Sequence, residues 1–269
     1  MITVDYHLHS THSGDGRDSI LAMSEAALAR GIREVAFTEH LDFDRTDPHY
    51  GFLDFDAYLA TVADVRDRLR GRLTVRTAIE FDFRREYGRE PRQVLRRLPV
   101  DFLLGSVHSA AGVAIYEIRP EQTDSLDLRA LRSAYLNEVE VLVASGLCHG
   151  LGHFDYLYKT LPDVFGPMRD AAYWARVEDI LRECVARGVA LEVNTHHIWD
   201  RGMGLAADEE ILHLYRRLGG RLVTVGSDAH RVADVGHGYA AAEAALGEVG
   251  FTALAGFEGG KAYEVPLDG

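Results

Sequence analysis

The sequence predicts an α/β fold in which seven parallel β-strands form a distorted barrel with α-helices outside. Three observations lead to this prediction. Apolar segments of strand length alternate with amphipathic segments of helix length about seven times along the 269 residues. The strand segments are apolar almost throughout, which is typical of parallel strands buried on both faces. Almost every strand segment ends in a histidine or an acidic residue, and a barrel explains this best because its strand ends converge on one mouth.

Apolar segments define the strands in chain order. They cover residues 2–4, 34–38, 73–79, 102–107, 148–152, 189–193 and 221–225, and glycine interrupts the fifth. Amphipathic segments define the helices between them, at residues 19–30, 55–70, 89–98, 126–145, 173–187, 208–218 and 240–249. Gly31, Gly146 and Gly188 end three of these helices, and Asp208 is the expected N-cap of another. A short apolar tail follows the last helix.

Composition limits the class of protein. Hydrophobic residues make up 47% of the chain, enough for a substantial core, and we expect one domain over residues 1–269. The formal net charge of −13 argues against a surface for nucleic acid. The sequence shows neither a signal peptide nor an apolar run of membrane-spanning length, so we expect a cytoplasmic protein without a membrane partner. Cys148 and Cys184 lack CxxC spacing and are expected to be buried free thiols. The oligomeric state stays open.

Side chains that bind metals gather at the carboxyl ends of the expected strands. His7 and His9 lie two residues apart, so both imidazoles project to the same side of an extended segment and can reach one ion. Such a pair alone also occurs by chance. The other candidates end later strands: His40, Glu80, His108, His153, Asp228 and His230. Because these eight groups exceed the ligands that one zinc needs, we predict two or three divalent ions (Zn, Fe or Mn), with Glu80 able to bridge a pair.

The motifs around these residues resemble the polymerase and histidinol phosphatase (PHP) family. They are His7-x-His9, Thr38-Glu39-His40, Glu80, Gly105-Ser106-Val107-His108, Gly152-His153-Phe154-Asp155 and Ser227-Asp228-Ala229-His230. The similarity spans nearly the whole chain. Less specific segments around the ligands are similar to the histidinol-phosphatase branch of this family. They are Tyr135-Leu136, Glu192-Val193-Asn194 and Gly219-Gly220.

The resemblance implies a TIM-like (β/α)7 barrel with three metal ions. The first ion would be held by His7, His9, Glu80 and Asp228, and the second by Glu80, His108 and His153. The third would be held by His40, His230 and one residue from the loop after His9. Spacing favours Asp15 for that last position, and His12 is its competitor in the same loop.

Basic residues that follow the strand ends are candidates for binding a phosphate group. Lys159 is the preferred contact and Arg201 is another, since basic side chains clamp a dianion. His196 and His197 follow the sixth strand, and on an extended segment only one of them can face the mouth; we select His197 as the substrate contact. Asp155 either orients a metal ligand or caps the loop that follows it.

The ligand set and the resemblance favour hydrolysis of a phosphate monoester. The most specific expectation is that L-histidinol phosphate and water give L-histidinol and phosphate, a step of histidine biosynthesis, by attack of metal-bound hydroxide. The expected catalytic residues are His7, His9, Glu80, Asp228 and His230. The sequence contains no G-x-S-x-G motif that would indicate a serine nucleophile.

Three alternatives remain open at this point. One is a phosphoesterase or nuclease of the same family acting on nucleotides or other phosphoesters, although the acidic charge weighs against long nucleic acids. Another is an amidohydrolase, a second kind of barrel with a His-x-His pair. The last is a non-catalytic metal-binding scaffold, which the completeness of the ligand set disfavours.

Overall fold

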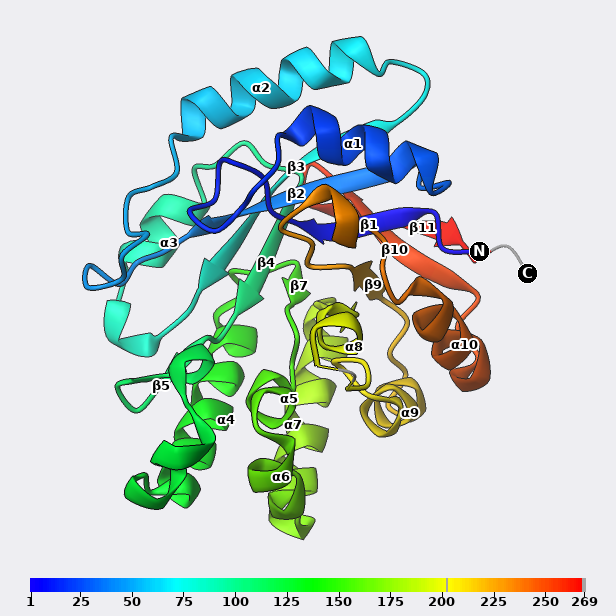
Figure 1. The fold of residues 1–269 in the computed structure, drawn as a ribbon. Coiled ribbons are helices and arrows are strands. Elements are labelled where there is room, and N and C mark those ends of the chain that lie inside the picture. Colours follow the sequence, from blue (N-terminus) through cyan, green and yellow to red (C-terminus); the bar gives the residue numbers. More distant parts are fainter. Residues whose placement is uncertain (202, 268–269) are drawn as a thin grey trace.

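The central feature of the computed structural model, which describes residues 1–201 and 203–267, is a sheet of seven parallel strands (Figure 1). Neighbouring strands follow in the order β1 (Val4–Leu8), β2 (Glu34–Leu41), β3 (Thr74–Asp82), β4 (Phe102–Ser106), β7 (Gly150–Leu151), β8 (Ala190–Asn194) and β9 (Val223–Gly226). All six neighbouring pairs are parallel. The spatial order equals the chain order, as expected when each strand returns to its neighbour through an outer helix.

The first and last strands, β1 and β9, approach each other and nearly close the sheet. At their carboxyl ends, the N–H of Asp228 donates to the carbonyl of His7 at 2.8 Å, and the N–H of His9 donates to the carbonyl of Ala229 at 3.0 Å. The buried carboxylate of Asp5 accepts two further hydrogen bonds, at 3.0 and 2.6 Å, from the residue that follows β9. The predicted distorted (β/α)7 TIM-like barrel is confirmed.

Helices cover the outside of the barrel (Figure 1). The helices that the sequence predicted are α1 (Ile20–Ala29), α2 (Phe55–Arg68), α3 (Glu90–Leu95), α4 (Leu128–Ser145), α7 (Ala171–Arg187), α9 (Glu209–Arg217) and α10 (Tyr239–Val249). Asp208 caps α9 as predicted, because its side chain accepts a hydrogen bond from the N–H of Ile211. Within the described part of the chain, no helix has the length and apolar character to cross a membrane.

Short elements that the sequence analysis did not predict lie in the loops after the strands. They are the hairpin β5 (Ser109–Ala110) and β6 (Val113–Ala114) and the helices α5 (Tyr156–Thr160), α6 (Pro162–Phe165) and α8 (His196–Arg201). All of them follow the carboxyl ends of β4, β7 and β8. They therefore surround the end of the barrel where the candidate ligands were expected.

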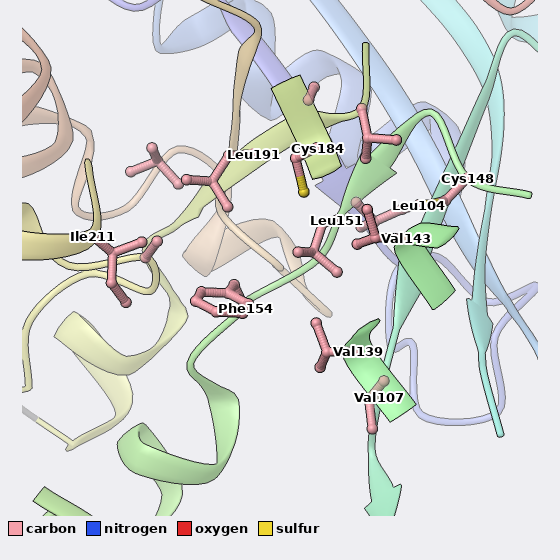
Figure 2. Close-up of a cluster of buried hydrophobic side chains, with 14 of the residues drawn as sticks. Leu104, Val107, Val139, Val143, Cys148, Leu151, Phe154, Cys184, Leu191 and Ile211 are labelled. Atoms are coloured by element: carbon pink, nitrogen blue, oxygen red, sulfur yellow. The ribbon is translucent and has the colours of Figure 1, made fainter. Parts of the chain in front are cut away.

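Both cysteines are buried in the apolar core that α4 and α7 form with the neighbouring strands. Figure 2 shows Cys148 and Cys184 among the side chains of Leu104, Val143 and Leu151. Both thiols are free, as the sequence predicted. Burial raises the pKa of Cys148 to about 12, so this thiol stays protonated and acts as a small apolar side chain.

The C-terminal tail is a β-hairpin, which the sequence analysis described only as an apolar tail. Strands β10 (Ala253–Glu258) and β11 (Lys261–Pro266) pair antiparallel and are joined by Gly259 and Gly260, whose φ angles are 53° and 77°. The N–H of Gly259 donates to the carboxylate of Asp101, just before β4, at 3.0 Å. The hairpin therefore lies at the amino ends of the strands, opposite the candidate site.

Candidate metal centre

The candidate ligands meet at the carboxyl ends of the strands, where each has a nitrogen or oxygen atom within 3.6 Å of another member of the set. The set is His7, His9, Asp15, His40, Glu80, His108, His153, Asp228 and His230. Parallel strands place these residues together although up to 223 positions separate them, His7 being the first and His230 the last. They form three groups that share Glu80 or adjoin it.

The first group is formed by His7, His9, Glu80 and Asp228. Nε2 of His7 lies 3.3 Å from Oε2 of Glu80 and 3.6 Å from Oδ1 of Asp228, and Nε2 of His9 lies 3.4 and 3.5 Å from the same two oxygens. Both nitrogens are buried and have no hydrogen-bond partner among the described residues. Two ligand atoms at ~2.1 Å from a tetrahedral ion are about 3.4 Å apart. The four atoms therefore have the spacing of ligands around one divalent ion.

The second group uses the other oxygen of Glu80. Oε1 of Glu80 lies 3.0 Å from Nε2 of His153 and 3.5 Å from Nε2 of His108, and these two nitrogens are 3.2 Å apart. The hydroxyl of Ser106 donates to the same oxygen at 2.6 Å and fixes the orientation of the carboxylate. Glu80 thus presents one oxygen to each group, which is the geometry of a bridging carboxylate.

The third group contains Asp15 and not its competitor His12. Oδ2 of Asp15 lies 3.1 Å from Nε2 of His230 and 3.4 Å from Nε2 of His40. The ring of His12 turns the other way, and its Nε2 lies 3.1 Å from the hydroxyl of Thr61 in α2. The placement thus agrees with the spacing argument that favoured Asp15.

Mutual charge interactions set the protonation of the cluster. Burial alone would raise the pKa of Glu80, but the charges of His7 and His108 outweigh it and hold that pKa well below its usual range. Burial alone would lower the pKa of His40, but Asp15 and Glu80 raise it to about 10. His9 differs, since burial and the charges of His40 and His230 lower its pKa to about 3. His9 is therefore neutral, and a neutral imidazole can offer a nitrogen lone pair to an ion.

Two buried glutamates support the cluster, and the sequence analysis assigned neither a role in the site. The carboxylate of Glu39 accepts hydrogen bonds from the hydroxyls of Ser10 and Ser13, both at 2.6 Å, and so orders the loop between His9 and Asp15. Oε1 of Glu192 lies 2.5 Å from Nδ1 of His7. For Glu192 the sequence offered a signal, an acidic residue inside the apolar strand expected over residues 189–193, because such a residue is stable only when it is paired.

The predicted substrate contacts lie on the short helices after β7 and β8. The ammonium of Lys159, on α5, lies 3.6 Å from Asp155 and 3.8 Å from Asp208. His197, on α8, is buried, and its ring centroid lies 5.8 Å from that of Tyr156. The side chain of the remaining predicted contact, Arg201, lies outside the described part of the structure.

The sequence argument about His196 and His197 rested on a wrong premise. The two residues begin helix α8 and are not extended, so their side chains do not point in opposite directions. Nδ1 of His196 lies 3.2 Å from the carbonyl of Asp228, whereas His197 packs on Tyr156. His196 therefore adjoins the ligand cluster, and His197 adjoins an aromatic residue beside the cluster.

Tyr156 connects these helices to the candidate ligands. Its ring centroid lies 4.8 Å from that of His153 and 5.6 Å from that of His108. The position of Asp155 is also unusual, since it is only 1% exposed and neither carboxylate oxygen accepts a hydrogen bond from a described residue. Burial raises the pKa of Asp155 to about 7.

The fold and these side chains define the class of the protein as an α/β barrel with a candidate metal centre of histidines and carboxylates at the carboxyl ends of its strands. The chain belongs to the PHP family, since the family model described as "PHP domain" matches residues 5–196. This agrees with the resemblance that the sequence motifs indicated.

Relatives over nearly the full length carry related names. A histidinol-phosphatase of Lactococcus lactis is 25% identical over 97% of this chain and 96% of its own. A probable histidinol-phosphatase of Deinococcus radiodurans is 30% identical over 91% of this chain and 93% of its own. Among solved structures, the histidinol phosphate phosphatase of L. lactis, complexed with Zn, L-histidinol and phosphate, matches with a TM-score of 0.82 at 24% identity, over 97% of this chain and 98% of its own. The last match establishes a shared fold.

Proposed function

We propose that this protein is a metal-dependent phosphate monoester hydrolase that converts L-histidinol phosphate and water into L-histidinol and phosphate. The observation that carries the proposal is the set of three ligand groups around Glu80, in which buried nitrogens and carboxylate oxygens have metal-ligand spacing. The choice of substrate is supported by the names of the full-length relatives from L. lactis and D. radiodurans.

The proposed ligand sets follow the three groups. The first ion is held by His7, His9, Glu80 and Asp228, the second by Glu80, His108 and His153, and the third by Asp15, His40 and His230. Mixed imidazole and carboxylate ligands suit Zn, Fe and Mn, and the zinc in the L. lactis structure supports Zn as one of them. When bound, such ions neutralise phosphate oxygens and lower the pKa of a coordinated water to about 7.

The residues of the chain contribute orientation and charge. Glu80 presents one carboxylate oxygen to each of the first two ligand groups, and the hydroxyl of Ser106 holds this carboxylate in place. We propose Lys159 as a phosphate contact, with Arg201 and His197 as further substrate contacts. Lys159 suits this role because its ammonium lies 3.6 and 3.8 Å from two carboxylates, longer than a hydrogen bond, so it can turn to a phosphate oxygen.

The proposal is tested by metal removal and replacement. Protein stripped with a chelator should release no phosphate from L-histidinol phosphate, and Zn, Mn or Fe should restore the release. A panel of nucleotides and sugar phosphates should be hydrolysed with a far lower kcat/KM. The His7→Ala variant, which lacks one ligand of the first group, is the negative control for contaminating phosphatases.

Two results would contradict the proposal in different ways. Equal or better hydrolysis of a nucleotide or a sugar phosphate would show that the substrate assignment is wrong and leave the phosphoesterase class intact. No turnover of any phosphoester by the metal-loaded protein would favour a non-catalytic metal-binding protein.

A further inference from the structure

We propose that Glu192 is a positioning residue that holds His7 and His153 in the orientation that two different metal ions require. Glu192 lies in the middle of β8 and is 1% exposed. It belongs to none of the three ligand groups. The inference rests on the proposed function only in that the groups bind metal ions, and it does not depend on the substrate.

The first contact of Glu192 selects the tautomer of His7. Oε1 of Glu192 lies 2.5 Å from Nδ1 of His7. Because a carboxylate only accepts, the proton of a neutral His7 is held on Nδ1, and the lone pair of Nε2 is left for an ion. That Nε2 faces Glu80 at 3.3 Å and Asp228 at 3.6 Å. Glu192 therefore stands behind His7 on the side opposite the first metal position.

The second contact of Glu192 reaches the other metal position through the backbone. Oε2 accepts a hydrogen bond from the backbone N–H of His153 at 2.6 Å. His153 has a φ angle of 21°, a conformation that a non-glycine residue keeps only when its surroundings hold it. In that conformation its Nε2 lies 3.0 Å from Oε1 of Glu80. Glu192 thus stabilises the backbone that directs His153 toward the second ion.

Asn194 extends the same network to Asp228. Its Nδ2 lies 3.4 Å from Oε2 of Glu192 and 3.2 Å from Oδ2 of Asp228. The side chains of Glu192 and His7 are tightly packed against Gly226. A Cβ atom at Gly226 would lie 2.6 Å from Oε1 of Glu192 and would overlap the Cβ of His7. The carboxylate of Glu192 is therefore confined to the place where both of its oxygens accept hydrogen bonds.

The contacts with His7 and His153 require two acceptor oxygens at residue 192. A glutamine has only one acceptor oxygen. In the Glu192→Gln variant, one orientation of the amide places its NH2 group against Nδ1 of His7, which moves the imidazole proton to Nε2, where the ion binds. The other orientation places the NH2 group against the N–H of His153 and leaves a buried donor unpaired. Either orientation weakens a metal position although the size of the side chain is unchanged.

The matched control is Glu138→Gln. Glu138 is also a buried glutamate; its Oε2 accepts from the backbone N–H of Arg85 at 2.7 Å, and its Oε1 forms an ion pair with Nε of the same residue at 3.0 Å. It lies on α4, outside the ligand groups. The same chemical change there removes a buried charge, with its ion pair to Arg85, without touching a metal position.

The experiment measures metal binding without substrate. Wild-type protein and both variants are stripped, reloaded with Zn, and assayed for bound ions by mass spectrometry and for affinity by chelator competition. We expect Glu192→Gln to bind Zn about 10- to 100-fold more weakly, and added Zn to restore part of its kcat with little change in KM. We expect Glu138→Gln to bind Zn as the wild type does.

Wild-type metal content and affinity in Glu192→Gln would overturn the proposal, as would an equal loss in Glu138→Gln. If Glu192→Gln does not fold, Asn194→Ala decides the matter, because it removes the link to Asp228 and is expected to weaken Zn binding by about tenfold. Unchanged Zn binding in Asn194→Ala would then overturn the proposal. Failure of the proposed function is seen separately, as wild-type protein that binds Zn and does not hydrolyse L-histidinol phosphate.

Discussion

Replacing Asp15 by asparagine tests which loop residue completes the third ligand group. Oδ2 of Asp15 lies 3.1 Å from Nε2 of His230 and 3.4 Å from Nε2 of His40, and the change removes its negative charge while keeping its size. The third group then consists of two histidines and a neutral amide. We expect Asp15→Asn to bind one ion more weakly and to lose phosphatase activity in parallel.

The magnitude follows from the strength and exposure of the contact. A hydrogen bond that involves an ionised group contributes about 1.5–3 kcal/mol, which corresponds to about a 10- to 150-fold change in affinity. The side chain of Asp15 is 42% exposed, so solvent screens its charge and the lower end of this range applies. We therefore expect the affinity for one of the ions to fall about tenfold.

Chelator competition and ion counting measure this effect, and His12→Ala is the control from the same loop. His12 contacts the hydroxyl of Thr61, so its loss should lower the free energy of unfolding by about 0.5–1.5 kcal/mol and leave the ion count unchanged. A lost ion in His12→Ala together with a full set in Asp15→Asn would refute the assignment of Asp15.

Two further predictions concern pH and the C-terminal hairpin. His40 has a pKa of about 10 in the metal-free protein, so an ion that binds to it must displace its proton. The affinity for Zn, measured by chelator competition, should therefore fall about 100-fold from pH 9 to pH 7. An affinity that does not change with pH would contradict this prediction. The same raised pKa stabilises the metal-free fold fully below pH 6.5 and less as the pH rises toward 10. Glu34→Gln should lower the free energy of unfolding, measured in urea, by about 1.5–3 kcal/mol, because the carboxylate accepts hydrogen bonds from Tyr6 at 2.5 Å and Arg76 at 3.1 Å. The control is Glu258→Gln at an exposed position of the C-terminal hairpin, which should change the free energy of unfolding by less than about 0.5 kcal/mol.

The barrel and the convergence of its candidate ligands could be predicted from sequence because both depend on local patterns. A buried parallel strand is an apolar run, and the residue that ends it is read directly from the chain. Thus β3 was expected over residues 73–79 and ends at Asp82, with Glu80 placed correctly at the mouth. Spacing along the loop after His9 favoured Asp15 over His12, and this assignment stays a prediction.

Long-range pairing could not be predicted in the same way. Glu192 and His7 are 185 residues apart, so nothing near Glu192 in the sequence shows what neutralises it. Helix α8 was missed for a local reason, because the side chain of Asn194 accepts a hydrogen bond from the N–H of His196 at 2.9 Å and turns the chain where an extended segment was expected. The pair Gly259 and Gly260 was a readable hairpin signal.

Assembly of the first ligand group and closure of the barrel depend on the same contacts. His7 lies in β1 and Asp228 follows β9, the two edge strands of the sheet, and the N–H of Asp228 donates to the carbonyl of His7 at 2.8 Å. Beside His7 in β1, the hydroxyl of Tyr6 accepts from the N–H of Phe257 at 2.6 Å, across 251 residues. Strand β1 is therefore held by segments from the end of the chain, and closing a loop of this length costs more chain entropy than closing a short one. For this reason the pair of His7 and His9 cannot create the metal position by itself, because Glu80 comes from β3 and Asp228 is brought to His7 by the closure between β1 and β9.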